Sequence, residues 1–389
     1  DMLKIRGKRI LIRADYNVPI SNNKVIDDYR IISSMKTIKF CINHNCSIVI
    51  MSHIGRPNKH ISSKNLSMIA IFNYFKDYFK NKIFFSNDCI SPESIEVSKG
   101  LEPGQIHILE NLRFYDNEKK NDIEFAKKLS KHGEVYINDA FGTSHRAHAS
   151  NNAIVKFFSL KGIGLLIKNE IHYLVKSLQI PKNPFLLILG GAKIDGKIDL
   201  IENLIKKVDY ILIGGAMAFT FLKAKGISIG KSLYQDDKIG YAKKMLQSHE
   251  SLSRKIILPI DLVVSTSLES NARITSVKSI RDNELGFDIG PETCKLFKSY
   301  IEKTKTLVWN GPMGVAEIKQ FNKGTESIAD SINKNTVNGN LVSVVGGGDT
   351  AASLDRNKLN FTHLSTGGGA SLELLSGNNL IGLDTINEQ

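Results

Sequence analysis

Four short polar clusters in the first part of the chain could bind an anion. They are rich in arginine, histidine, asparagine and aspartate, and each directly follows an apolar run: residues 13–19, 52–57, 110–114 and 138–148. Lysine supplies most of the 52 basic residues, so arginine here indicates a need for its rigid, bidentate donor fork. A single cluster would fit a turn or a capped helix equally well. Four in succession predict one surface for phosphate or carboxylate groups.

Glycine-rich turns mark the second half of the chain in the same way. They follow apolar runs at Gly190-Gly191, Gly214-Gly215, 346–348 and 367–369. Glycine permits a close backbone approach, and a helix that begins there points its free N–H groups at an anion. Lys193 and Lys197 are spaced to share one side of a helix start. Together these features predict a nucleotide phosphate site.

Two other kinds of site are less well supported. His145 and His148 could suggest zinc, but no third ligand has suitable spacing, so we expect no zinc site. Asp27 and Asp28 precede a predicted helix and are expected to cap it.

A nicotinamide-dependent dehydrogenase would share the fold class, yet no GxGxxG sequence follows the first strand of either half. Thermal shifts with MgADP but not NAD would favour the predicted nucleotide phosphate site over that alternative.

The elements that must position these residues alternate along the whole chain. Apolar runs predict strands over 8–16, 46–52, 105–111, 134–140, 184–191, 209–215, 255–264, 305–311, 339–346 and 361–365. Amphipathic stretches predict helices over 30–44, 64–80, 121–132, 197–207, 235–249, 291–303 and 323–334. A helix over 167–179, ended by Pro181 and Pro184, is suited to join two halves. Such alternation predicts parallel sheets covered by helices on both faces, with ligands beyond the carboxyl ends of the strands.

Composition is consistent with this organisation. A length of 389 residues favours roughly two domains. The chain is 42% hydrophobic and 23% charged, which excludes a disordered, collagen-like or membrane-spanning protein. Its four cysteines form no CxxC pair and no signal-peptide pattern opens the chain, so we expect a cytoplasmic location. The chain begins at Asp1, and we expect a few residues to precede it.

The net charge of +13 leaves one further alternative open. It favours anionic partners but does not choose between a nucleic acid and a small polyanion. No arginine-rich arm, zinc-finger spacing or aromatic RNA-binding signature is present, so we expect neither a nucleic-acid partner nor a membrane partner. Salt-sensitive binding of DNA or RNA would be the contrary observation.

The clusters and glycine turns closely resemble the phosphoglycerate kinase family, along essentially the whole chain. The segments that carry the resemblance are RADYNVP (13–19), SHIGRP (52–57), ENLRF (110–114), YINDAFGTSHRAHAS (136–150), LGGAKIDGKI (189–198), GGAMAFTFLKAKG (214–226), DIGPET (288–293), VWNGPMGV (308–315), VVGGGDTAA (344–352) and HLSTGGGASLELL (363–375). The resemblance implies an α/β fold of two doubly wound parallel-sheet (Rossmann-like) domains joined by a hinge helix. It assigns 1–164 to an N-terminal phosphoglycerate-binding domain and 165–376 to the hinge helix and a C-terminal nucleotide-binding domain, with the tail 377–389 packing back on the first domain.

The resemblance also implies the residues of each site. The phosphoglycerate site would comprise Arg13, Asp15, Tyr16, Asn17, Arg30, His53, Ile54, Gly55, Arg56, Arg113, Arg146 and His148. The nucleotide site would comprise Lys193, Lys197, Gly214, Gly215, Gly290, Asn310, Glu317, Gly347, Gly348, Asp349 and Thr350. Glu317 would hold the ribose, and Asp349 would lie beside the magnesium ion on the phosphates. Arg30, Lys197, Gly348 and Gly369 would be catalytic.

The implied reaction is reversible, Mg²⁺-dependent phosphoryl transfer between 1,3-bisphosphoglycerate and ADP, giving 3-phosphoglycerate and ATP in glycolysis. Transfer would be in line, on closure of the hinge, in a monomer. Three departures from the family pattern, Tyr29, Ala316 and the sequence between Lys193 and Lys197, remove no expected catalytic group.

Overall fold

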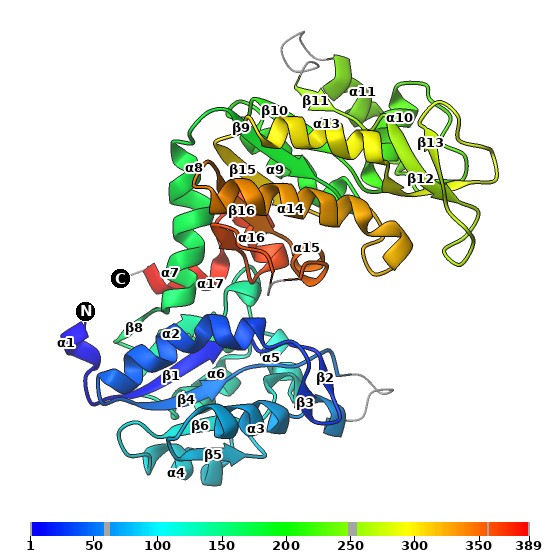
Figure 1. Cartoon of the computed structure of the whole chain (residues 1–389). Helices are drawn as coiled ribbons and strands as arrows, with labels where there is room; N and C mark the ends of the chain where they lie inside the picture. The colour runs from blue at the N-terminus through cyan, green and yellow to red at the C-terminus, as the bar shows by residue number, and fades with distance from the viewer. Residues whose placement is uncertain (1, 58–62, 248–254, 356–357, 388–389) are drawn as a thin grey trace. The chain divides into compact units, whose positions relative to one another are not determined.

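The computed structural model describes residues 2–57, 63–247, 255–355 and 358–387, and its parts are labelled in Figure 1. The chain divides into two compact units. Unit 1 comprises residues 1–172 and 379–389, and unit 2 comprises residues 173–378.

Unit 1 contains a parallel six-stranded sheet in the order β5-β6-β4-β1-β7-β8. The strands are β1 (Arg9–Ala14), β4 (Ser47–Met51), β5 (Ile83–Ser86), β6 (Ile106–Leu109), β7 (Val135–Asp139) and β8 (Lys161–Ile163). A short antiparallel hairpin pairs β2 (Ile20–Ser21) with β3 (Lys24–Val25). The helices are α1 (Met2–Ile5), α2 (Tyr29–Asn43), η1 (Ser63–Leu66), α3 (Ile69–Tyr78), α4 (Pro92–Lys99), η2 (Leu112–Phe114), α5 (Asp116–Lys119), α6 (Ile123–Ser130), η3 (Phe141–Thr143), η4 (Ala153–Phe157), α7 (Leu165–Ile171) and α17 (Ile381–Asn387).

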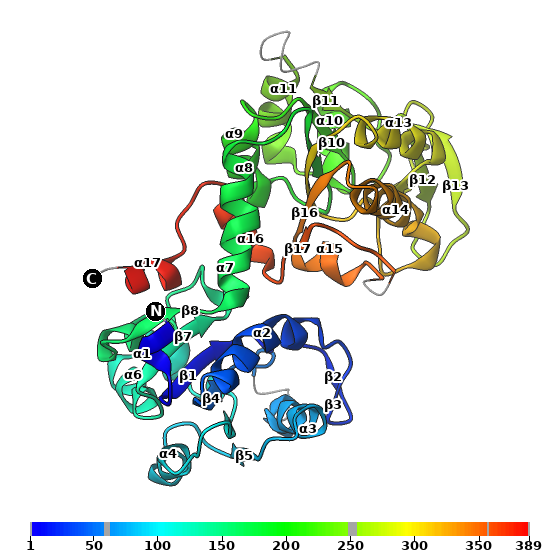
Figure 2. The same ribbon diagram turned by 60° about the vertical axis from the view of Figure 1, so that its left-hand side comes forward.

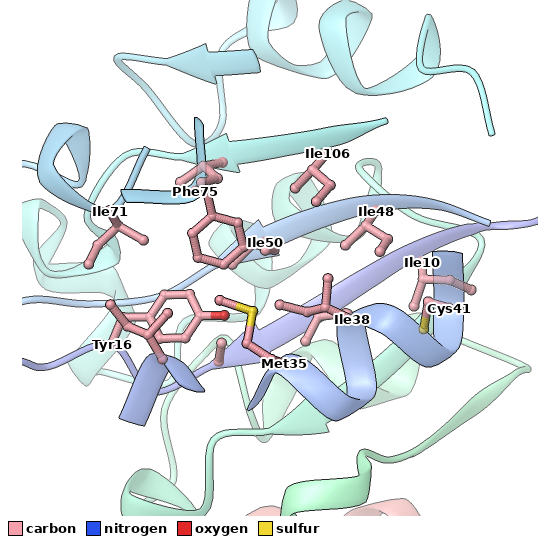
Figure 3. Close-up of a cluster of buried hydrophobic side chains, with 14 of the residues drawn as sticks. Ile10, Tyr16, Met35, Ile38, Cys41, Ile48, Ile50, Ile71, Phe75 and Ile106 are labelled. Carbon is pink, nitrogen blue, oxygen red and sulfur yellow. The ribbon is translucent and has the colours of Figure 1, made fainter. Parts of the chain in front are cut away.

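Alternating side chains of these strands supply a core on each face of the sheet. Ile10 and Ile12 of β1 pack with the apolar sides of α2 and α3, where Met35 and Phe75 are buried (Figure 3). Leu11, between them, joins the cluster on the opposite face, which includes α6 and η4. A strand in a sheet that is buried on both faces has a continuous apolar sequence, which is why these strands could be predicted.

The C-terminal helix α17 belongs to unit 1. Ile386 joins the second of these core clusters, and α17 contacts β8, as Figures 1 and 2 both show. Two hydrogen bonds hold its first turn, one to β7 and one to the residue that follows η3. Asn138 Nδ2 donates to the Gly382 carbonyl oxygen at 3.0 Å, and Gly382 N donates to the Ser144 carbonyl oxygen at 2.9 Å.

Unit 2 contains a second parallel six-stranded sheet, in the order β11-β10-β9-β15-β16-β17. The strands are β9 (Phe185–Leu189), β10 (Tyr210–Ile213), β11 (Ile256–Ile257), β15 (Thr306–Asn310), β16 (Val342–Gly346) and β17 (His363–Leu364). In chain order this is the 3-2-1-4-5-6 arrangement of a doubly wound nucleotide-binding sheet, whose order reverses between β9 and β15.

Helices cover both faces of this sheet. They are η5 (His172–Lys176), α8 (Ser177–Gln179), η6 (Asp195–Lys197), α9 (Ile198–Leu204), α10 (Met217–Ala224), η7 (Asp236–Lys238), α11 (Ile239–Gln247), α13 (Pro291–Ile301), η8 (Lys319–Phe321), α14 (Lys323–Val337), α15 (Gly348–Ala352) and α16 (Gly368–Leu375). The core on one face unites Leu186 and Ile188 with α13 and α14, and α9 lies on the other side of the sheet with α16 (Figure 2). Both units are therefore doubly wound α/β structures, and the predicted fold class is confirmed.

Two of the predicted elements differ in the structure, and the end of a third lies outside the described residues. The predicted strand over 255–264 is wrong, because β11 ends at Ile257 and the chain then enters an antiparallel sheet of β12 (Asp261–Ser265), β13 (Arg273–Ser276) and β14 (Leu285–Ile289). The predicted helix over 167–179 is present, but its middle is the π-helical turn η5. The helix expected over 235–249 is observed as far as Gln247, and its last two residues lie outside the described ranges. Within the described ranges, no helix combines the length and apolarity that a membrane span requires.

Candidate active site

The four polar clusters lie together at the carboxyl ends of the unit 1 strands. Arg13, the penultimate residue of β1, is almost fully buried at 1% exposure. Its Nε donates to Ser150 Oγ at 2.7 Å, one terminal nitrogen donates to the Ala14 carbonyl oxygen, and the other lies 3.2 Å from His53 Nδ1. Because arginine can only donate, His53 Nδ1 accepts, and the ring proton lies on Nε2. His53 can then donate that proton in a hydrogen bond to an anion.

Arg30 faces the same site from the first turn of α2. Its guanidinium donates to Asp15 Oδ2 at 3.0 Å and to the Asn17 carbonyl oxygen at 3.3 Å. The Asn17 side-chain oxygen accepts from Gly55 N at 2.8 Å, which ties the loop after β1 to the loop after β4. Arg30 remains 26% exposed, so it is both oriented and open to a ligand.

Positive charge accumulates here beyond what the local carboxylates balance. Arg113 donates to the Gly55 carbonyl oxygen at 2.6 Å, whereas Arg56 and Arg146 are exposed. Burial, together with the charges of Arg13 and Arg146, lowers the pKa of Arg113 to about 10. Even so, it stays protonated at neutral pH, and such a cluster attracts anions.

His148 and a buried glutamate stand behind this cluster. Burial and neighbouring arginines lower the pKa of His148 to about 4, so it is neutral at pH 7. Glu118, 1% exposed, accepts hydrogen bonds from Ser150 N at 3.0 Å and Ser150 Oγ at 2.6 Å. Ser150 thereby links Glu118 to Arg13. Sequence reasoning missed both Ser150 and Glu118. Ser150 is the last residue of the 136–150 segment, whereas Glu118 lies outside all of the segments that carry the resemblance.

Two of the expected phosphoglycerate residues are part of the framework. Tyr16 is fully buried, and its hydroxyl pairs with Ser34 Oγ at 2.9 Å (Figure 3). Its backbone N donates to Ser52 Oγ, and its carbonyl oxygen accepts from Val18 N. Ile54 is likewise buried, with both backbone groups bonded to the Asn111 side chain. These residues shape the loops rather than present polar groups to solvent.

Unit 2 contains a cavity of about 250 Å³ at the carboxyl end of its parallel sheet. Its lining comprises Gly191, Ala192, Gly215, Ala216, Phe219, Leu233, Leu262, Gly286, Phe287, Asp288, Ile289, Pro312, Met313, Gly314, Val315, Glu317 and Asp349. Apolar side chains dominate this set, and the carboxylates and glycine backbone are its main polar components. A planar apolar group with a charged extension would suit such a cavity. The sequence did not indicate the apolar wall, because its members come from several separate segments.

The glycine turns meet at the point where the strand order reverses. A Cβ on Gly190 would lie 2.1 Å from the Pro312 carbonyl oxygen, and one on Gly215 would lie 2.4 Å from Gly191 N. Gly214 and Gly290 are similarly confined, by Met313 Sδ at 2.6 Å and by the Asp261 carboxylate at 2.2 Å. Side chains are therefore excluded here, and backbone forms this end of the cavity.

Lysine and amide donors border these turns. Lys197 Nζ donates to the Lys193 carbonyl oxygen at 3.3 Å, while Lys193 itself is exposed. Burial lowers the pKa of Lys197, and the charge of Asp349 opposes that shift. Among the described residues, Asn310 Nδ2 is buried without a hydrogen-bond acceptor, 3.1 Å from the position of a Cβ on Gly347. An unpartnered buried donor beside a glycine turn is suited to an anionic ligand.

Two helix N-termini complete this end of unit 2. α15 begins at Gly348 after Gly347, whose φ of 101° favours glycine, and α16 begins at Gly368. Gly348, Gly369 and Asp349 are exposed, and Glu317 is exposed at the rim of the cavity. The Thr350 hydroxyl accepts from Gly311 N at 2.7 Å and so joins α15 to β15.

The donor set fits a magnesium ion that arrives with a nucleotide. Across the described ranges, no group of three or more His, Cys, Asp or Glu side chains could hold a metal by itself. Asp349 nevertheless presents an exposed carboxylate at the cavity. Mg²⁺ is commonly held by one or two carboxylates together with phosphate and water oxygens.

Comparisons with known proteins agree with this geometry. The family model described as phosphoglycerate kinase matches residues 1–378. Phosphoglycerate kinases of Finegoldia magna and Chlorobium phaeobacteroides are 45% and 43% identical to the chain; the matches cover 100% and 99% of it and 98% of each relative. The phosphoglycerate kinase structure from Coxiella burnetii is 34% identical, with a TM-score of 0.81 over 99% of this chain and 97% of that one. The structure from Pyrococcus horikoshii is 28% identical, with a TM-score of 0.86 over 98% of this chain and 96% of that one. With both half-sites and these full-length matches, the chain belongs to the phosphoglycerate kinase family, a family of glycolytic phosphotransferases.

Proposed function

We propose that the chain catalyses reversible, Mg²⁺-dependent phosphoryl transfer between 1,3-bisphosphoglycerate and ADP, giving 3-phosphoglycerate and ATP. The observation that supports this most directly is the pair of unlike anion sites. One is an arginine cluster in unit 1, and the other is a glycine-lined, largely apolar cavity in unit 2. A small phosphorylated acid suits the first, and a nucleotide suits the second.

In unit 1, the proposed ligand is phosphoglycerate. Arg30, Arg56, Arg113 and Arg146 would supply guanidinium donors to its phosphate and carboxylate. His53 would donate from Nε2, because its Nδ1 faces the obligate donor Arg13. Asp15 and Asn17 orient Arg30. Their oxygen atoms lie in the same cluster and would accept a hydrogen bond from the hydroxyl group of the acid. Tyr16, Ile54 and Gly55 form the loop framework.

In unit 2, the proposed ligand is ADP or ATP. The base and ribose would occupy the cavity, with Glu317 at its rim, and the phosphates would extend toward Gly214, Gly215, Gly347 and Thr350. Lys193, Lys197 and Asn310 would donate to phosphate oxygens. Bound Mg²⁺ would neutralise phosphate charge, with Asp349 beside it. This division assigns 1–164 to phosphoglycerate and 165–376 to the nucleotide.

The reaction needs positioning and charge neutralisation more than acid–base chemistry. The acceptor is a carboxylate in one direction and a phosphate in the other, and each is already a nucleophile. The transferring group is loosely bonded and spreads negative charge over its oxygens. Arg30, Lys197 and the N–H groups at Gly348 and Gly369 are the proposed donors to those oxygens. In-line transfer requires both ligands to meet, so we propose a domain closure once both are bound.

A coupled assay tests the proposal. Protein, 3-phosphoglycerate and MgATP are mixed with a dehydrogenase that reduces the acyl phosphate product, and NADH oxidation is followed. Turnover that needs all three components is the expected result. Binding of MgADP without turnover would contradict the proposed reaction while leaving the nucleotide site intact. We also propose that the active species is a cytoplasmic monomer, which sedimentation of the active protein would test.

A further inference from the structure

One wall of the nucleotide cavity is a single segment, residues 314–324, between β15 and α14. Gly314, Val315 and Glu317 of this segment line the cavity. Glu317 is exposed at the rim, so its position depends on the path of the segment that carries it. Three ties hold that path: Val315 N donates to the Phe287 carbonyl oxygen at 2.9 Å, Met313 N donates to Thr325 Oγ1 at 2.9 Å, and the third comes from Asp288.

Asp288 makes the third tie with a buried carboxylate. It lies at the end of β14 and is 3% exposed. Its Oδ2 accepts from Gly324 N, in the first turn of α14, at 2.7 Å, and its Oδ1 accepts from Ile289 N at 2.9 Å. The α14 N-cap residue, Asn322, makes no side-chain cap bond of its own. The start of α14 is thus capped from a neighbouring strand.

The carboxylate also fits closely between the two ends of the segment. A Cβ on Gly314 would lie 2.4 Å from Asp288 Oδ1, and one on Gly324 would lie 2.3 Å from the same atom. Both ends of the segment are therefore in contact with one carboxylate, which itself lines the cavity. A side chain of different length or donor pattern could not occupy this place without moving the segment.

We propose that Asp288 is a positioning residue for the nucleoside half of the nucleotide: by clamping residues 314–324, it holds Glu317 and the adjoining wall in the geometry that binds base and ribose. The inference rests on the proposed function of unit 2. It assigns a role to the first residue of the DIGPET segment, in which the family resemblance implied a role only for Gly290. Asp288 is not proposed to affect binding of the phosphate groups, which extend toward the glycine turns.

Asp288→Asn is the informative substitution, because it keeps the shape and replaces one acceptor by a donor. The new amide would face either Gly324 N–H or Ile289 N–H, so one of the two hydrogen bonds is lost. We expect the KM for MgATP to rise about tenfold, with kcat and the KM for 3-phosphoglycerate changed by less than about twofold. The inhibition constant of tripolyphosphate, measured in competition with MgATP, should not change. A general loss of folding would weaken the binding of MgATP and of tripolyphosphate alike, so it would not produce this pattern.

Two further variants complete the design. Glu284→Gln, just before β14, removes another buried carboxylate, one that binds Arg273 at 2.7 Å and does not line the cavity. It should lower stability and leave the KM for MgATP unchanged. Thr325→Val removes the Met313 tie and should raise that KM in the same direction as Asp288→Asn. Because both ties act on one segment, the double variant should show less than the product of the two effects.

The outcomes separate this inference from the proposed function. Wild-type protein without kinase activity would overturn the proposed function. An active wild type, with an Asp288→Asn variant whose KM for MgATP is unchanged, would overturn the role of Asp288 alone. Equal weakening of MgATP and tripolyphosphate would also overturn it, because the carboxylate would then act on the whole site.

Discussion

A Cβ on Gly368 would lie 2.9 Å from the backbone nitrogen of Gly348. The first residues of α16 and α15 are therefore adjacent, although each helix follows a different strand of the unit 2 sheet. Two sets of free N–H groups meet at this point, and together they favour negative charge more strongly than either alone.

That adjacency predicts an unusual response to Gly368→Ala. We expect kcat to fall by about tenfold or more, because the added methyl group separates donors aimed at the transferring phosphoryl group. The free energy of unfolding should also fall, because the methyl group meets the backbone nitrogen of Gly348 rather than a flexible side chain. Steady-state kinetics and chemical denaturation measure the two effects.

Gly240→Ala is the matched control for this substitution. Gly240 also lies in a helix, α11, but a Cβ there would meet nothing within 4 Å. This variant should keep wild-type kcat. Equal kcat values for the Gly240 and Gly368 variants would argue against a role for the paired helix starts.

Arg30→Ala should reduce kcat by about a hundredfold or more, because Arg30 is proposed to donate to the group being transferred. Its ion pair with Asp15 is partly exposed, so the loss of stability should stay below about 1 kcal/mol. The coupled assay and thermal unfolding check both statements. Arg30→Lys tests whether charge alone suffices, and near-normal turnover in the alanine variant would rule out the assignment.

Removal of magnesium should abolish turnover, and added Mg²⁺ should restore it. Asp349→Asn should raise the Mg²⁺ concentration needed for half-maximal activity about tenfold, because the carboxylate proposed to lie beside the ion is lost. Binding of 3-phosphoglycerate, followed by calorimetry, should be the same in both proteins. An unaltered Mg²⁺ requirement would place the ion away from Asp349.

A buried hydrogen-bond chain in unit 1 predicts acid sensitivity. His132 Nε2 lies 3.1 Å from the Cys89 carbonyl oxygen, so it donates, and its Nδ1 accepts from Ser98 Oγ at 2.6 Å. Ser98 Oγ then accepts from His107 Nδ1 at 2.8 Å, and His107 Nε2 accepts from Ser86 Oγ at 2.8 Å. In this arrangement both rings are neutral, and all four ring nitrogens are hydrogen-bonded.

Burial lowers the pKa of His107 to about 3 and that of His132 to about 4, from an ordinary 6.5. Between pH 4 and 6.5 the unfolded chain therefore binds more protons than the folded one, and these residues make stability fall as pH falls through this window. His132→Gln should be less stable than wild type at pH 7. The difference in the free energy of unfolding between the two proteins should shrink by on the order of 1–2 kcal/mol at pH 5, because the unfolded variant has no His132 to protonate. A difference that is the same at both pH values would contradict neutral burial of His132.

Elements with strong local patterns could be predicted from the amino-acid sequence alone. Strands such as β1 and β9 are buried on both faces, so they appear as continuous apolar runs. The arginine clusters and glycine turns follow those runs directly, so the sequence also indicated where the two proposed sites would lie. By contrast, β8, which has only three residues, and the antiparallel strands β13 and β14 have weak local patterns, and they were not predicted.

Which side chains of these segments meet depends on the tertiary structure. Tyr16 lies in an arginine-rich motif, yet its hydroxyl is bonded inside the core, whereas Arg30, from a different element, faces the site. Asp288 and Gly324 are far apart in sequence, and their contact depends on how β14 is placed beside α14. Local patterns report the period of an element and the turn that follows it. Which atoms become neighbours across elements depends on packing between residues distant along the chain, and a pattern confined to one segment does not contain that information.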